Sequence, residues 1–318
     1  MHAEHIAAQQ QSLKPHLVEP LLTTLIRRQL PDTSMLDFAV VLANKAPLKV
    51  SHSVHCVSSP TLIVSPPLQP VVVNRFLQNV LQHQHFVGVC GKHGSPSQRN
   101  QVTRLLDALF RLHPANTCQP SHIEPLFQVY GGTMSSPDRR LLSIMRLFET
   151  EKRTSLSAFF SRWSPSPDAT VSEALEVVQN FDPVYMLRTC LAFPSWRRFG
   201  EEKGTKDGPA DDSMYDPLMV IVVSAQMLVQ CLPTTPLGWV KVFRSNVVSL
   251  LIRCLSSKDA NIRETALCQV ASLWESVQVS SISVTWADGF IQTLFYGRNL
   301  TCTKHLKSYT CSACSRMR

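Results

Sequence analysis

The stretch SSKDANIRETALCQVASLWE, residues 256–275, decides how the chain folds. Asp259 can cap a helix, because its carboxylate can accept a loose backbone N–H at the helix start. Ile262, Arg263 and Ala266 follow at helical spacing. The arginine can bond the backbone or an aspartate of a neighbouring helix, and the alanine lets two helices approach closely. This combination is typical of the second helix of a HEAT-type repeat.

A second stretch, SSPDRRLLSIMRLFE at 135–149, has the same plan. Both stretches begin Ser-Ser-x-Asp, continue with an early arginine and end near an acidic residue. Asp138 and Asp259 are separated by about three periods of 40 residues. We therefore predict an all-α, HEAT/armadillo-like α-solenoid in which Asp138, Arg140, Asp259 and Arg263 are structural repeat positions. A helical bundle without repeats is the alternative.

Four helix starts are marked by a small polar residue followed by proline. They are Ser95–Pro96, Ser136–Pro137, Asp182–Pro183 and Asp216–Pro217. The side-chain oxygen of the first residue can accept a backbone N–H, and proline has no N–H to lose and is already set to the helical φ. Each pair therefore predicts where a helix begins.

The glycines in YGGTMSSPDRR, residues 130–140, allow two interpretations. They could form a phosphate-binding loop, but the stretch lacks converging glycines and the Lys-Ser/Thr pair of the P-loop. We interpret it as a turn between two helices. The first helix should end at Gly131 in a left-handed conformation, and Ser136 should cap the second, with Pro137 at its first position.

The composition supports a large buried core and allows an anionic partner. The chain has 318 residues, of which 44% are hydrophobic and 17% charged, and its net charge is +8 with a pI of about 9.1. Such a charge permits an RNA partner without requiring one. The most apolar stretch, 218–232, is shorter than the about 20 residues that a membrane-spanning helix needs. We predict that it forms a buried core helix.

The order of segments gives the predicted domain boundaries. Residues 1–43 form N-terminal helices of the repeat domain, and 44–70 form an irregular insert rich in Ser and Pro. Residues 71–278 form the main helical-repeat domain, with a mobile polar loop at 200–214. Residues 279–318 do not continue the repeat pattern and are predicted to be an unstructured C-terminal tail.

Five blocks in a fixed order resemble one protein family. The first, 130–149, matches a Tyr-x-Gly-Thr-x-Ser-x-x-Asp-Arg block that leads into a helix ending in Phe-Glu. SLSAFFSRW, FDPVYMLRTCLAFP, YDPLMVIVVSAQ and LIRCLSSKDANIRETALCQVASLW follow in that order, the last at 251–274. Their succession resembles the C-terminal domain of the nucleolar pre-ribosomal-associated protein 1 family, with the best match over 95–278.

The resemblance implies a non-catalytic scaffold in nucleolar assembly of the large (60S) ribosomal subunit and in pre-rRNA processing. The implied partners are pre-60S assembly factors and pre-rRNA, and the implied location is the nucleolus. It implies no catalytic activity. From the residues we also expect no cofactor, no small-molecule substrate and no membrane association. A generic HEAT/armadillo adaptor in transport or trafficking is the alternative, because it would share every feature except the block order.

Two groups of residues are candidate binding sites. Trp196, Arg197 and Arg198 combine a ring with two charges and are our candidate partner or RNA contact; a solvated helix end is the alternative. A further set has ligand types that suit zinc: Cys302, His305, Cys311 and Cys314. The gap between its two halves is short, so we predict a cysteine-rich tail and no metal site there. No catalytic serine or cysteine signature is present.

Overall fold

The computed structural model describes residues 69–91, 94–164, 171–199 and 210–279, together with Pro20, Thr23, Thr24, Leu36 and Ala39. The predictions for the insert before residue 69, for 200–209 and for the C-terminal tail from 280 on therefore lie outside the described residues. So do nearly all of the predicted N-terminal helices and the four candidate zinc ligands.

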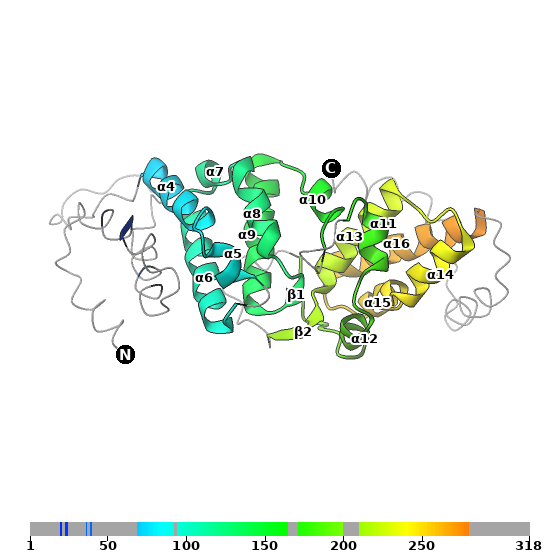
Figure 1. The fold of residues 1–318 in the computed structure, drawn as a ribbon. Coiled ribbons are helices and arrows are strands. Elements are labelled where there is room, and N and C mark those ends of the chain that lie inside the picture. The colour runs from blue at the N-terminus through cyan, green and yellow to red at the C-terminus, as the bar shows by residue number, and fades with distance from the viewer. Residues whose placement is uncertain are drawn as a thin grey trace, which may run out of the picture. The chain divides into compact units, whose positions relative to one another are not determined.

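The described chain is mostly helical and divides into two compact units (Figure 1). Unit 1 holds the residues up to Gly131 together with Ser135–Thr154, and unit 2 holds Gly132–Met134 together with the residues from Ser155 onward. The prediction of one repeat domain over 71–278 stays a prediction.

Unit 1 is built on two long helices, α6 and α9. Its described elements are α4 (Pro70–Leu81), α5 (Phe86–Cys90), α6 (Pro96–Leu112), α7 (Pro114–Thr117), the 3₁₀ turn η2 (Pro120–His122), α8 (Ile123–Val129) and α9 (Ser136–Lys152). α6 packs against α9, α5 packs against α6 and α8, and α8 packs against α9. The rings of Phe110 and Phe148 meet across the α6–α9 contact, 5.7 Å apart, and both side chains are fully buried.

Unit 2 surrounds a central helix, α13. Its described elements are β1 (Thr133–Met134), α10 (Ser157–Phe160), α11 (Ala174–Gln179), α12 (Pro183–Leu191), β2 (Asp211–Tyr215), α13 (Pro217–Gln230), α14 (Pro236–Arg244), α15 (Val247–Cys254) and α16 (Ala260–Val279). α13 packs against α10, α11, α15 and α16. Most side chains of α13 up to Met227 are buried, whereas Val229 is 71% exposed, so the prediction of a buried core helix at 218–232 is confirmed up to Met227.

The contacts within each unit follow two layers. In unit 1, α6 packs against α9 in the first layer and α5 packs against α8 in the second. In unit 2, α11, α13 and α16 form the first layer, in which each helix packs against the next, and α12 packs against α15 in the second. Polar bonds link the layer members α13 and α16: Gln269 Nε2 donates to the carbonyl of Ile221 at 3.0 Å, and Ser224 donates to Gln269 Oε1.

The predicted loop at 200–214 is wrong over its last residues. Asp211–Tyr215 form β2, which pairs antiparallel with β1. Tyr215, 2% exposed, fixes the end of the strand: its ring lies 5.1 Å from that of Phe181, and its N–H donates to Thr189 Oγ1 at 2.9 Å. The polar residues before Tyr215 gave no strand pattern, and its pairing partner, Thr133, is too distant in the sequence to leave a local signal. The fold is therefore not purely α-helical.

Two helix-boundary predictions are wrong by one residue. Ser135, not Ser136, caps α9; its Oγ accepts the N–H of Asp138 at 3.4 Å. The left-handed glycine is Gly132, with φ of 68°, not Gly131. The starts of α6, α12 and α13 lie where the polar-proline pairs predict.

Candidate partner-binding surface

Asp138 joins three segments of unit 1. Its carboxylate is fully buried and lies 2.6 Å from Nη2 of Arg99 on α6. Asp138 Oδ1 also accepts the N–H of Gly131 at 2.9 Å. Arg99 in turn donates from Nη2 to the carbonyl of Val129 at 3.1 Å and from Nε to that of Cys90 at 2.8 Å. This cluster ties the ends of α5 and α8 to the starts of α6 and α9.

Each of the other three predicted repeat positions makes a polar bond, and the bond of Arg140 joins two helices. Arg140 Nη1 lies 2.5 Å from Asn100 Oδ1, which links α9 to α6. Arg263 Nη1 donates to the carbonyl of Ser257 at 2.8 Å. Asp259 Oδ1 accepts the N–H of Asn261 at 2.8 Å at the start of α16. No comparison tests the repeat role of these residues, so that role stays a prediction.

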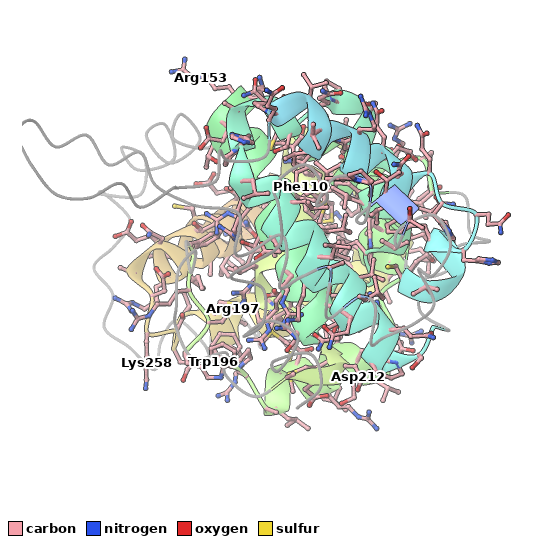
Figure 2. All side chains as sticks on the ribbon, turned by 90° about the vertical axis from the view of Figure 1, so that its left-hand side faces the viewer. Phe110, Arg153, Trp196, Arg197, Asp212 and Lys258 are labelled. Carbon is pink, nitrogen blue, oxygen red and sulfur yellow. The ribbon has the colours of Figure 1, made fainter. Side chains whose placement is uncertain are left out.

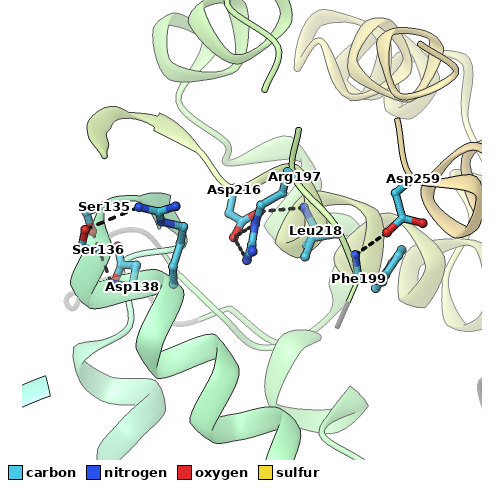
Figure 3. A network of polar contacts seen from close by, with 9 residues as sticks. Ser135, Ser136, Asp138, Arg197, Phe199, Asp216, Leu218 and Asp259 are labelled. Atoms are coloured by element: carbon cyan, nitrogen blue, oxygen red, sulfur yellow. Dashed lines mark hydrogen bonds and ion pairs between the residues drawn. The ribbon is translucent and has the colours of Figure 1, made fainter. Parts of the chain in front are cut away.

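The candidate contact residues lie in the loop after α12, which makes polar contacts with the rest of unit 2 at three points. Asp259 Oδ2 accepts the N–H of Phe199 at 2.7 Å, and the N–H of Lys258 donates to the carbonyl of Ser195 at 2.9 Å. The ion pair between Arg197 and Asp216 is the third contact (Figure 3). A loop held in this way presents its remaining side chains in one defined arrangement.

Arg197 is turned inward to Asp216. Its Nη2 lies 2.8 Å from Asp216 Oδ2, and its Nε lies 3.2 Å from the same oxygen. Asp216 is fully buried, and Arg197 is 7% exposed. Asp216 Oδ1 also accepts the N–H of Leu218 at 3.0 Å, which caps α13. The Asp216–Pro217 pair predicted the cap. The ion pair with Arg197 had no local sequence signal, because Arg197 lies in a different segment.

Trp196, Arg198 and Lys258 form the outer face of the loop, which we call the loop surface. Trp196 is half-buried, and Arg198 and Lys258 are exposed. Figure 2 labels Trp196 and Lys258 next to each other and Arg197 above Trp196, and the N–H of Lys258 bonds to Ser195, the residue before Trp196. The tertiary structure thus turns Arg197 towards Asp216 and bonds the backbone of Lys258 to the loop. The sequence did not single out Lys258, because it lies in the connection between α15 and α16.

Two searches of the described residues concern other kinds of site. No group of three or more His, Cys, Asp or Glu side chains in the described ranges could hold a metal ion. Among the helices that the structure describes, none is long and apolar enough to cross a membrane.

Comparison with known proteins finds two relatives with the same name. Nucleolar pre-ribosomal-associated protein 1 of Mus musculus is 26% identical over 196 residues, which cover 55% of this chain and 8% of the mouse protein. This chain is a distant homologue of a small region of that protein. The Homo sapiens protein is 23% identical over 230 residues, which cover 66% of this chain and 10% of nucleolar pre-ribosomal-associated protein 1.

The relationship confirms the predicted resemblance as a distant one. The chain spans only a small part of the length of the curated relatives that it matches. No protein-family model matches the chain, and no solved structure matches it.

Proposed function

We propose that this chain is part of a non-catalytic scaffold that acts in the nucleolus, in assembly of the large ribosomal subunit and processing of pre-rRNA. The observation that carries the proposal is the distant homology to nucleolar pre-ribosomal-associated protein 1, whose name places that protein with pre-ribosomes in the nucleolus. A mostly helical fold suits a scaffold, because stacked helices offer extended surfaces to several partners. The proposed partners are pre-60S assembly factors and pre-rRNA.

The proposed architecture is a HEAT/armadillo-like solenoid over residues 71–278. The helices of the first layer begin at Pro96, Ser136, Ala174, Pro217 and Ala260, which are spaced by about 40 residues, the length of a HEAT or armadillo repeat. Within each unit, helices of one layer pack against the next helix of the same layer. Contacts between neighbouring repeats in this order support a solenoid over a bundle without repeats.

The loop surface is the proposed contact with RNA. Arg198 and Lys258 supply positive charge for phosphates, and the ring of Trp196 supplies a face on which a base can stack. Arg197 is proposed to act indirectly, because its guanidinium holds Asp216 and thereby the loop. The net charge of +8 favours association with a polyanion.

Localisation and co-purification of the full-length chain test the scaffold proposal. We expect the tagged chain to concentrate in nucleoli and to recover pre-60S factors and precursor rRNA. A cytosolic or vesicular distribution, with none of these partners, would instead identify a trafficking adaptor and refute the proposal.

The RNA contact is tested separately, by binding of single-stranded RNA to the full chain at several salt concentrations. Arg198→Ala/Lys258→Ala should weaken binding and lower the slope of log K against log salt by about 1.4, since each phosphate contact on a single strand contributes about 0.7. The control is Arg75→Ala/Lys241→Ala, which removes the same charge from two exposed positions elsewhere. Equal effects of the two double variants would mean that binding follows net charge and not the loop surface.

A further inference from the structure

Helix α12 exposes an apolar stripe. Val184 is 54% exposed, Leu187 50% and Leu191 73%. Their spacing of three and four residues places them on one face of the helix. Single apolar side chains at a surface need no explanation, but a contiguous group marks an interaction site. The other exposed large hydrophobic residues of the described chain are distributed over several helices: Val71, Val87, Val229, Leu237 and Leu267.

The opposite face of α12 fixes the helix in place. Met186 and Thr189 are fully buried, and α12 packs against β2 and α15. Thr189 Oγ1 donates to the carbonyl of Tyr185 at 2.7 Å, and Asp182 caps the helix through the N–H groups of Val184 and Tyr185. The stripe therefore lies on a helix that is already formed, so a partner would not have to supply the free energy of ordering it.

Positive charge lies within the stripe and at its C-terminal end. Arg188 is exposed and lies four residues after Val184 and three before Leu191. Arg253 of α15 is exposed and donates from Nε to the carbonyl of Cys190 at 3.0 Å, which places a second guanidinium at the end of α12. The acidic group near Arg188 is Asp211, whose pKa is lowered by hydrogen bonds from Ser213 and, less strongly, by the charge of Arg188.

We propose that the exposed face of α12 is a docking surface for an amphipathic helix of a partner protein, with acidic residues of that helix meeting Arg188 and Arg253. An apolar helix face typically binds the apolar face of a partner helix, whose contact residues lie at positions i, i+3 or i+4, and i+7 of that helix. They provide no ring for base stacking, which favours protein over RNA at this face. The inference does not rest on the ribosomal function or on the loop surface.

Site-specific cross-linking of the full chain in cells tests the proposal. The photo-reactive residue p-benzoylphenylalanine replaces Leu187 or Leu191, and cross-linked peptides are identified by mass spectrometry. Matched controls carry it in place of Val71 on α4 or Leu237 on α14, which are 67% and 65% exposed. Both α12 positions should cross-link one segment of a partner protein, with apolar residues at helical spacing and Asp or Glu among them, and the controls should not.

Three other outcomes would overturn the proposal: cross-links to RNA, cross-links to this chain itself, or a yield no higher than that of the controls. The identified segment, made as a labelled peptide, then provides a binding assay with the full chain. Leu187→Ser should weaken binding at least about tenfold, and Arg188→Ala should weaken it about fivefold, with a smaller effect at high salt. Val71→Ser should leave affinity unchanged. An unchanged affinity of Arg188→Ala would refute the acidic partner, and circular dichroism checks that each variant is folded.

Discussion

Replacing Arg197 by methionine should destabilise unit 2 by about 3 kcal/mol. The substitution keeps an apolar stem of similar length but removes the charge that faces Asp216, whose side chain is 1% exposed. Removing one partner of a buried ion pair costs about 3–5 kcal/mol, because the remaining charge is left buried without compensation. We expect the lower end of this range, because the N–H of Leu218 still donates to the carboxylate.

Urea unfolding of the full chain followed by tryptophan fluorescence measures this change. The described tryptophans, Trp163, Trp196, Trp239 and Trp274, report on unit 2, because all four lie in it. Arg162→Met is the matched control, since Arg162 is exposed on the same unit, and it should change the free energy of unfolding by less than about 0.5 kcal/mol.

A double-mutant cycle separates the ion pair from other effects of the substitution. Arg197→Met combined with Asp216→Asn should cost less than the sum of the two single changes, by about 0.5–3 kcal/mol, because asparagine can still cap α13 but carries no buried charge. Additive costs, or a cost of Arg197→Met equal to that of the control, would refute the reasoning.

Three further predictions concern unit 1. Burial lowers the pKa of His122 from its ordinary 6.5. Below pH 6.5 the unfolded chain therefore binds a proton at this residue more readily than the folded chain, and the free energy of unfolding should fall as the pH falls towards the folded pKa. Denaturation at several pH values should show a smaller loss of stability for His122→Asn. Gly131→Ala should destabilise by about 2 kcal/mol, because its Cβ would lie 2.9 Å from Asp138 Oδ2. A Cβ at Gly88 meets nothing within 4 Å, and Gly88 lies inside helix α5, so Gly88→Ala should raise the melting temperature slightly. Burial raises the pKa of Cys90 to about 12, so site-resolved alkylation should reach this thiol only after unfolding.

Local patterns predicted the helices well because their causes are local. Asp182 and Asp216 cap α12 and α13 through their own side chains, as the polar-proline pairs indicate. The apolar composition of 218–232 was sufficient to predict burial, since such a helix has no polar face to expose. Thr235 caps α14 before Pro236 in the same way, so the same signal could have located that helix as well.

The candidate site was predicted only in part, because its decisive contacts join distant segments. The sequence indicated a charged aromatic cluster at 196–198 but treated its two arginines alike. The structure turns Arg197 inward to Asp216 and leaves Arg198 exposed. The stripe on α12 was also missed, because an apolar residue in a sequence does not reveal whether a neighbour covers it.

The sequence by itself determined that the described chain is mostly helical, where α6, α12 and α13 begin and that most of α13 is buried, because capping, proline geometry and apolar composition act within one turn or one helix. Only the tertiary structure decided which charges are paired inside, that Asp211–Tyr215 form a strand and which face of α12 stays uncovered. These features depend on contacts between segments that are distant in the sequence, and the pattern within one segment does not show which other segment it will meet.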